Sequence, residues 1–338
     1  MLRFIDGFDH ISSAANRTLK YDLSGSSSHV KESTEGRNGG NCVELYLATA
    51  GYLQKMLDNQ NTWTVGFAFR MKDVLFSGSG PIISFMDSNE AVQCALYATA
   101  GGFLEVRRGT SSILGTSSNA MSVNSWYYIE MEVTINDSTG AVEVRRNGVE
   151  EIKLTGVDTK YTSLSGANGF RLYGGTSSTR VLIDDLYVCD ATGTTNNSFL
   201  GDVRVDTLFP TADGANTDFT PLAGSNYENV DEDDPDGDTS YNSSNTATDK
   251  DTFPVTALSS MAGDIFGVQV NNTARKDDAG AQNLKGAVKV GATVYTDSAQ
   301  VLLDSYDDKR SIFEENPGTS AAWDQAGINA AEFGYEVA

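Results

Sequence analysis

The sequence is poor in the residues that most often carry catalytic chemistry. Its 338 residues include two histidines, three cysteines and six prolines. His10 and His29 both lie in polar segments typical of loops, and no G-x-S-x-G turn follows a strand, so a nucleophilic triad is not indicated. Neither G-x-x-x-x-G-K-S/T nor G-x-G-x-x-G occurs, so nucleotide binding has no support.

Positive charge is scarce as well. Lys and Arg number 24 against 46 Asp and Glu, which gives a net charge of −22 and a pI near 4.3. Proteins that follow a phosphate backbone need a cationic face, so nucleic-acid binding is not expected. No run of about 18 apolar residues occurs, so no membrane insertion is expected. The first ten residues lack the apolar segment of a secretory signal, so no such signal is expected either.

The cysteines do not predict a set of disulfide bonds or a metal site. Three cysteines cannot all pair with one another, and their spacing is not that of a metal site. Each lies inside a strand-like run, and a free cysteine behaves as a small apolar residue. The sequence therefore predicts buried free thiols at Cys42, Cys94 and Cys189.

Alternation of apolar and polar residues dominates the first two hundred residues. Between residues 61 and 70 every second residue is aromatic or aliphatic, which is the period of a half-buried strand. Asn147-Gly148 between two such runs indicates a two-residue hairpin turn. Many short strands without a convincing amphipathic helix predict an antiparallel β-sandwich or jelly roll, with one short helical turn at Gly51–Asn59. The expected core includes Trp63, Phe67, Trp126, Leu186 and either Ile129 or the residues that alternate with it.

The charge divides the chain near residue 200. Residues 1–200 hold 16 Lys and Arg against 21 Asp and Glu, whereas residues 201–338 hold 8 against 25. From residue 222 to residue 251 the chain is polar, and we expect it to become ordered only against a neighbouring molecule. We therefore predict an all-β chain with a sandwich at 1–192, a polar acidic connector or extended arm at 193–257, and a smaller, mainly-β domain at 258–338.

Several blocks in order along the chain resemble the concanavalin A-like, laminin G-type jelly rolls of bacteriophage virion proteins. These blocks are Phe4–Asp9, Trp126–Glu130, Asn147–Gly148, Ile183–Val188, Phe199–Val205 and Asn316–Trp323. The resemblance implies a structural protein of the tail, baseplate, fibre or head surface. Such a protein assembles in the host cytoplasm with other virion proteins and with copies of itself, here through its C-terminal part.

The search for catalytic carboxylates finds one weak candidate. Concanavalin A-like folds include glucanases with an E-x-D-x-x-E strand, and retaining hydrolysis needs two carboxylates close together. Glu130-x-Glu132 is the nearest approach, but no third carboxylate follows. The favoured interpretation is two glutamates on a solvent face, so we expect a protein that is not an enzyme. A glycan-degrading enzyme is the second alternative.

The first alternative is a carbohydrate-binding module that recognises a host-surface glycan. Sugar sites need an aromatic platform with polar neighbours. Tyr97, Tyr161 and Tyr173 lie near turns and could form one. Aromatic residues in strands are more often core residues, so no glycan-binding residue is selected.

Calcium is the remaining candidate ligand, because laminin G-type folds often bind it at a sandwich edge. Two sites are considered: the pair at residues 184–185 and the acidic run at residues 231–238, whose spacing echoes the start of an EF-hand loop but lacks its last glutamate. Carboxylates bonded to loop N–H groups, and a solvated acidic loop, are the favoured alternatives. The candidate ligands are Asp184, Asp185, Asp234 and Asp236.

Overall fold

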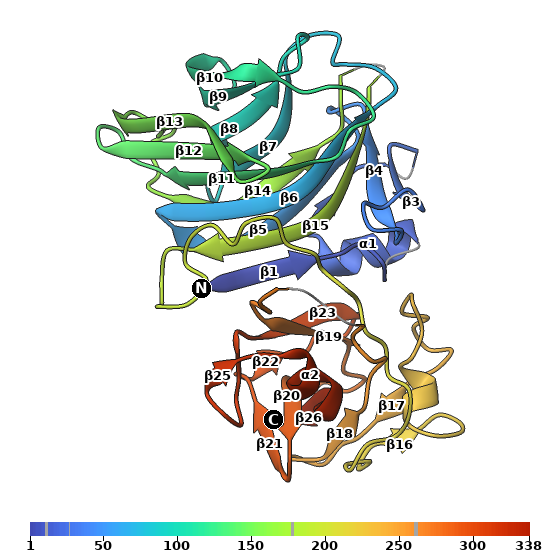
Figure 1. Ribbon diagram of the computed structural model, residues 1–338. Helices are drawn as coiled ribbons and strands as arrows, with labels where there is room; N and C mark the ends of the chain where they lie inside the picture. The colour runs from blue at the N-terminus through green and yellow to red at the C-terminus, as the bar shows by residue number, and fades with distance from the viewer. Residues whose placement is uncertain (11–12, 27, 177–178, 260–262) are drawn as a thin grey trace. The chain divides into compact units, whose positions relative to one another are not determined.

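The regular structure of the chain is almost entirely antiparallel strand, as Figure 1 shows, so the predicted all-β class is confirmed. This computed structural model describes residues 1–338 except 11–12, 27, 177–178 and 260–262. The chain forms two compact units, Met1–Val205 and Asp206–Ala338. Among the described residues, no helix has the length and apolar character to cross a membrane.

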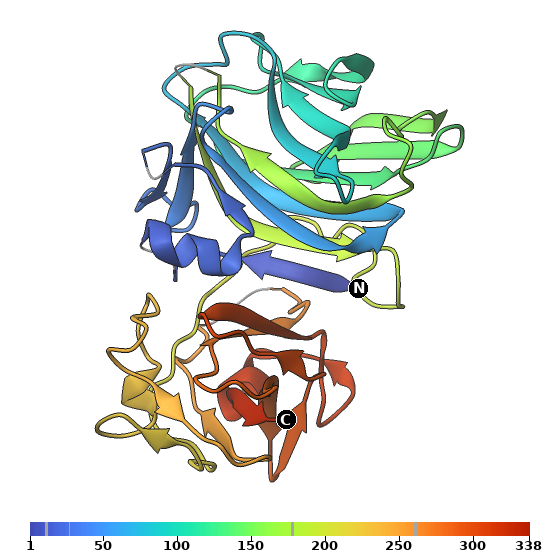
Figure 2. The same cartoon turned by 180° about the vertical axis from the view of Figure 1, so that it is seen from behind.

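Unit 1 is the predicted antiparallel sandwich, and its two layers are seen from opposite sides in Figures 1 and 2. Sheet A has the strand order β13-β12-β11-β6-β15-β4-β3, with β1 beside β15. Its strands are β1 (Leu2–Asp6), β3 (Val30–Ser33), β4 (Cys42–Tyr46), β6 (Thr62–Lys72), β11 (Tyr127–Thr134), β12 (Gly140–Arg146), β13 (Val149–Val157) and β15 (Arg180–Asp190).

The second layer, sheet B, has the order β10-β9-β8-β7-β14-β5-β2. Its strands are β2 (Leu23–Ser24), β5 (Tyr52–Gln60), β7 (Gly80–Met86), β8 (Val92–Ala98), β9 (Phe103–Arg108), β10 (Ser112–Ala120) and β14 (Ala167–Tyr173). A short helix, α1 (Ala14–Lys20), follows β1.

The core of unit 1 lies between the sheets and follows the predicted alternation. Trp63 is 1% exposed, and Phe67, Ile129 and Leu186 are fully buried. In a strand, successive side chains point to opposite faces, so each of these residues directs its chain neighbours outward. The three cysteines are buried and free, as predicted.

The prediction for Trp126 is wrong. Trp126 precedes β11, whose regular pairing starts at Tyr127, so it lies outside the alternating register. Its ring is half-buried, and the guanidinium carbon of Arg70 lies 5.2 Å from the ring centroid. The tryptophan therefore covers the outside of sheet A instead of filling the core.

The sequence predicts one local element, a hairpin turn, correctly and another, a helical turn, wrongly. Asn147 and Gly148 join β12 to β13 with φ angles of 52° and 76°, as expected for the predicted hairpin. The helical turn expected at Gly51–Asn59 is absent, because this segment forms β5 and pairs with β14 and β2. Leu53 is fully buried in the core there, so tertiary pairing overrides the local pattern.

Unit 2 is smaller and mainly β, with a five-stranded sheet in the order β18-β26-β20-β21 and β22 beside β20. Its core includes Val288, Trp323, Ile328 and Phe333. Its strands are β16 (Thr220–Pro221), β17 (Asn242–Ser243), β18 (Lys250–Phe253), β19 (Val268–Ala274), β20 (Asn283–Val290), β21 (Thr293–Thr296), β22 (Gln300–Val301), β23 (Asp307–Phe313), β24 (Glu315–Asn316), β25 (Ala321–Ala322) and β26 (Glu332–Val337). Its helices are η1 (Tyr227–Asn229) and α2 (Gln325–Ala330).

The boundary between the units differs from the expected one. The structure places it after Val205, and the acidic stretch belongs to unit 2 instead of forming a separate arm. Asp251 is fully buried and accepts hydrogen bonds from the backbone N–H of Phe219 at 3.0 Å and from Nδ2 of Asn226 at 2.8 Å. Buried polar contacts hold this segment, and composition does not reveal such contacts.

We predict that Gly66→Ala destabilises unit 1. A Cβ at Gly66 would lie 2.1 Å from the ring of Tyr187, and that ring is fixed by a 2.5 Å hydrogen bond from its hydroxyl to Glu130. Overpacking of this kind lowers the free energy of unfolding by about 1–3 kcal/mol. Urea denaturation measures the loss. Gly78→Ala is the matched control, because no atom lies within 4 Å of its Cβ position. Equal midpoints for both variants would contradict the prediction.

Candidate functional site

The outer face of sheet A is covered by residues 198–205, which we call the crossing segment. The backbone N–H of Gly201 donates to Oε1 of Glu130 at 2.8 Å, and the N–H of Val205 donates to Oδ1 of Asp185 at 2.8 Å. Glu130 is consequently fully buried. The expectation that Glu130 lies on a solvent face is wrong. The segment that covers Glu130 is distant in the sequence, so the local pattern of residues does not reveal its burial.

Asp184 and Asp185, which lie on strand β15 of sheet A, are also buried. Strand β15 is irregular at this point, where Asp185 has a φ of 51°, so simple alternation does not apply to the pair. Asp184 accepts hydrogen bonds from the N–H groups of Arg37 and Asp185, both at 2.8 Å. Burial raises the pKa of Asp184 to about 7, and the negative charge of Asp185 adds to this shift. Both carboxylates thus have protein partners, as the alternative to calcium proposes.

Carboxylates of the acidic run at residues 231–238, in unit 2, also have hydrogen-bond and ion-pair partners within the chain. The hydroxyl of Ser240 donates to Glu232 and Asp236, and Asp238 pairs with Arg275 at 3.0 Å. Among the described residues, no three His, Cys, Asp or Glu side chains are grouped as a metal site would require. The sequence favours no bound cofactor, and calcium at Asp184, Asp185, Asp234 and Asp236 stays an untested alternative.

The outer face of sheet B carries a cluster of polar and aromatic side chains. One row runs across five neighbouring strands, because Arg171 pairs with both Gln54 and Ser84, Ser84 pairs with Ala95, and Ala95 pairs with Arg107. Their chain neighbours lie in the core, so the row points outward. We call the cluster the sheet B face: Tyr52, Gln54, Ser84, Ala95, Tyr97, Glu105, Arg107, Arg171 and Tyr173.

Two arginines on this face lie over tyrosine rings. The guanidinium carbon of Arg107 lies 4.1 Å from the ring centroid of Tyr97. That of Arg171 lies 4.9 Å from the centroid of Tyr52 and 5.9 Å from that of Tyr173. Cation–π contacts of this kind hold the flexible arginine side chains in place. The face therefore presents guanidinium groups whose positions are largely fixed before any ligand binds.

Further hydrogen bonds fix the neighbouring groups. Nε of Arg107 donates to Glu105 at 2.6 Å, and the hydroxyls of Tyr173 and Ser84 lie 2.8 Å apart. Burial raises the pKa of Tyr97, against the opposing effect of Arg107. Tyr97 is therefore a neutral phenol near pH 7, able to donate a hydrogen bond.

The side-chain amide of Gln54 on the sheet B face makes only part of the hydrogen bonds that it could make. The residue is fully buried, and its Oε1 accepts a 2.8 Å hydrogen bond from Nε of Arg171. This contact sets the orientation of the amide, and its Nε2 is buried without a hydrogen-bond partner among the residues that the structure describes. Buried polar groups are nearly always paired, so this amide donor calls for an acceptor, either a water molecule or a ligand group that reaches it when the covering side chains move.

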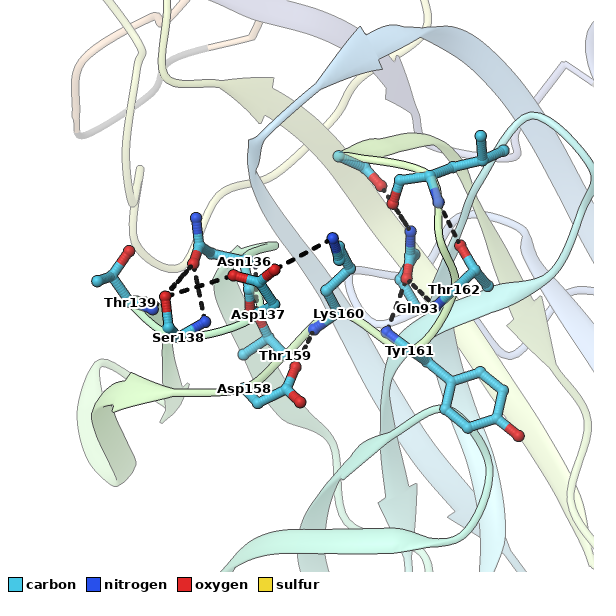
Figure 3. A network of polar contacts seen from close by, with 12 residues as sticks. Gln93, Asn136, Asp137, Ser138, Thr139, Asp158, Thr159, Lys160, Tyr161 and Thr162 are labelled. Atoms are coloured by element: carbon cyan, nitrogen blue, oxygen red, sulfur yellow. Dashed lines mark hydrogen bonds and ion pairs between the residues drawn. The ribbon is translucent and has the colours of Figure 1, made fainter.

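A loop of residues 158–162 is bound to strand β8 through Gln93, as Figure 3 shows. Oε1 of Gln93, on β8, accepts hydrogen bonds from the N–H groups of Tyr161 and Thr162 at 2.8 and 2.9 Å. The ring of Tyr161 points away from Gln93 and is largely exposed. Of the three tyrosines considered from the sequence, Tyr97 and Tyr173 share the sheet B face, and Tyr161 lies on this loop.

Comparison with known proteins gives a fold likeness only. No protein family and no curated protein match the chain. A structure of alginate lyase Aly36B is 12% identical, covers 55% of this chain and 95% of its own, and has a TM-score of 0.42. The cellulose-induced protein Cip1 is 14% identical, with 55% and 97% covered and a TM-score of 0.41. A Trypanosoma rangeli sialidase is 13% identical, with 47% and 26% covered and a TM-score of 0.35. At these values, nothing about activity follows.

One sequence-based conclusion is corrected by this finding. We expected a protein that is not an enzyme, because no E-x-D-x-x-E pattern occurs. The solved structures that share part of this fold include alginate lyases, so the expectation that this chain is not an enzyme is withdrawn. The missing motif is specific to one enzyme group and does not exclude others.

The buried Asp184 predicts a pH dependence of stability. Its pKa rises from 3.8 to about 7 on folding, so the folded state holds one more proton than the unfolded state between these values. The free energy of unfolding therefore falls as the pH rises from 4 to 7, and it levels off above 7. Asp184→Asn removes this contribution. Urea denaturation at several pH values measures the difference between variant and wild type, and a difference that is constant from pH 4 to pH 8 would contradict the assignment.

Proposed function

We propose that the sheet B face binds a polysaccharide and places a carboxylated sugar unit against Arg171 and Gln54. The observation that carries this proposal is the buried Nε2 of Gln54, which lies beside a fixed guanidinium group and lacks an acceptor within the described part of the chain. A carboxylate accepts hydrogen bonds from both groups at once. Such charge-assisted bonds are stronger than neutral ones.

The surrounding residues fit a sugar chain. Ser84 and Ala95 are small and lie between Arg171 and Arg107 in the same row, and both are buried beneath the surrounding side chains, so a ligand reaches the sheet there only when those side chains move aside. The tyrosines offer apolar ring edges together with hydroxyl groups, which suits the mixed surface of a sugar. Arg171 also pairs with exposed Glu90 at 3.3 Å, a weak contact that a ligand carboxylate can replace.

Binding to a soluble polyuronate tests the proposal. Arg171→Lys removes the planar donor pair, and Gln54→Leu removes the unpaired amide. We expect each variant to bind about tenfold more weakly or worse, since a hydrogen bond to a charged group contributes about 1.5–3 kcal/mol. Isothermal titration calorimetry measures the affinity, with a neutral glucan as comparison. Arg275→Lys, on unit 2, is the matched control. Unchanged affinity in both test variants would contradict the proposal.

A second candidate is cleavage of the same glycan by β-elimination. A base removes the proton next to the carboxylate, the glycosidic oxygen leaves with a proton, and a double bond forms in the sugar. Arg171 would hold the carboxylate, and the neutral phenol of Tyr97 would supply a proton to the leaving oxygen. The observation that favours this candidate is the presence of both groups on one face. The unsaturated product absorbs ultraviolet light, so a rising absorbance that Tyr97→Phe abolishes supports it, and a constant absorbance contradicts it.

The resemblance to bacteriophage virion proteins stays a prediction. A glycan-binding face fits a receptor-recognition module on a virion, which was the first alternative from the sequence. The partners that this implies are other virion proteins, copies of the same chain and a host-surface glycan. Mass spectrometry of purified particles from a producing host tests this setting separately from glycan binding.

A further inference from the structure

A cavity opens at the edge of sheet A, away from the sheet B face. Its volume is about 190 Å³, enough for a small oxyanion together with water. Its walls come from β3, β4, β15 and the turn before β3. The lining residues are Ser28, His29, Lys31, Glu44, Tyr46 and Arg180.

His29 is held firmly in this cavity. Its ring lies parallel to that of Tyr46, with centroids 5.4 Å apart and an interplanar angle of 3°. Nδ1 lies 2.7 Å from the hydroxyl of Ser26 and 2.8 Å from that of Ser28. In the tautomer in which a serine hydroxyl donates to Nδ1, the ring carries its proton on Nε2, which is then a donor.

The charges around the cavity leave one cation in excess. Glu44 is shared by two cations, with Lys72 at 3.4 Å and Arg180 at 3.7 Å. Arg180 also pairs with Asp73. Lys31 faces Glu44 across β3 and β4, and no ion pair is found for it among the described residues. In a chain with a net charge of −22, a cavity whose lining holds two cations and one carboxylate is unusual.

We propose that this cavity binds a small oxyanion, phosphate or sulfate, free or as the monoester of a sugar. Lys31 and Arg180 supply positive charge, and Nε2 of His29 supplies a hydrogen bond. Aromatic packing and the serine hydroxyls orient the imidazole before binding, which lowers the entropic cost of binding. The site lies on the opposite sheet from the sheet B face, so it does not depend on the proposed glycan binding.

Nuclear magnetic resonance of the histidine rings tests this site in the whole chain. The protein has two histidines, so its imidazole signals are few, and His29→Asn assigns them. Inorganic phosphate and inorganic sulfate are titrated at constant pH against chloride of equal ionic strength. We expect a saturable shift of the His29 signals and no shift of the His10 signals. Lys31→Ala should weaken the apparent affinity about tenfold, the loss of one charge-assisted hydrogen bond.

The controls separate a specific site from general charge effects. Lys153→Ala removes an exposed lysine of β13 and should leave the affinity unchanged. Glucose 6-phosphate and glucose 6-sulfate form a second arm. Tighter binding of an ester than of the free anion identifies a sugar ester as the ligand source, and the reverse identifies the free anion. Absence of a saturable shift with all four probes, or equal affinity in wild type and Lys31→Ala, overturns the proposal.

Discussion

The apolar layer between sheets A and B determines which side chains of unit 1 can meet a ligand. Leu53, Leu172 and Leu96 fill this layer, and strand alternation then directs their chain neighbours outward. Because neighbouring strands are in register, Gln54, Arg171, Ser84, Ala95 and Arg107 form one row across sheet B. The candidate glycan site is thus a geometric consequence of the core, and core variants that shift the register would disperse it.

The two outer faces of the sandwich have different roles. On sheet A, backbone N–H groups of the crossing segment donate to Oε1 of Glu130 and Oδ1 of Asp185, and both residues are buried. On sheet B, Arg171 and Gln54 are held by each other and by aromatic rings, and the amide nitrogen of Gln54 is left without an acceptor. The outer face of sheet A thus buries carboxylates beneath a chain segment, whereas the outer face of sheet B carries a row of polar and aromatic side chains that pack on one another.

Sequence patterns predict what depends on near neighbours along the chain. They predict the buried Trp63, the Asn147-Gly148 turn and the all-β class, because period and turn chemistry are local. They fail for Glu130, whose cover is the distant crossing segment, and for the polar stretch that Asp251 ties into unit 2. Tyr97 and Tyr173 were considered as a platform, but Arg171 and Gln54 were not, because only strand pairing brings these two side chains together.

The most direct test of the central claim is a crystal structure of the chain with a bound oligouronate. The account predicts a sugar carboxylate within about 2.7–3.2 Å of Nε2 of Gln54 and of the guanidinium nitrogens of Arg171. It also predicts that the side chains covering Nε2 of Gln54, which is buried in the free protein, move aside when the sugar binds. An oligouronate bound on sheet A or on unit 2, with the amide of Gln54 still unpaired, would contradict the account.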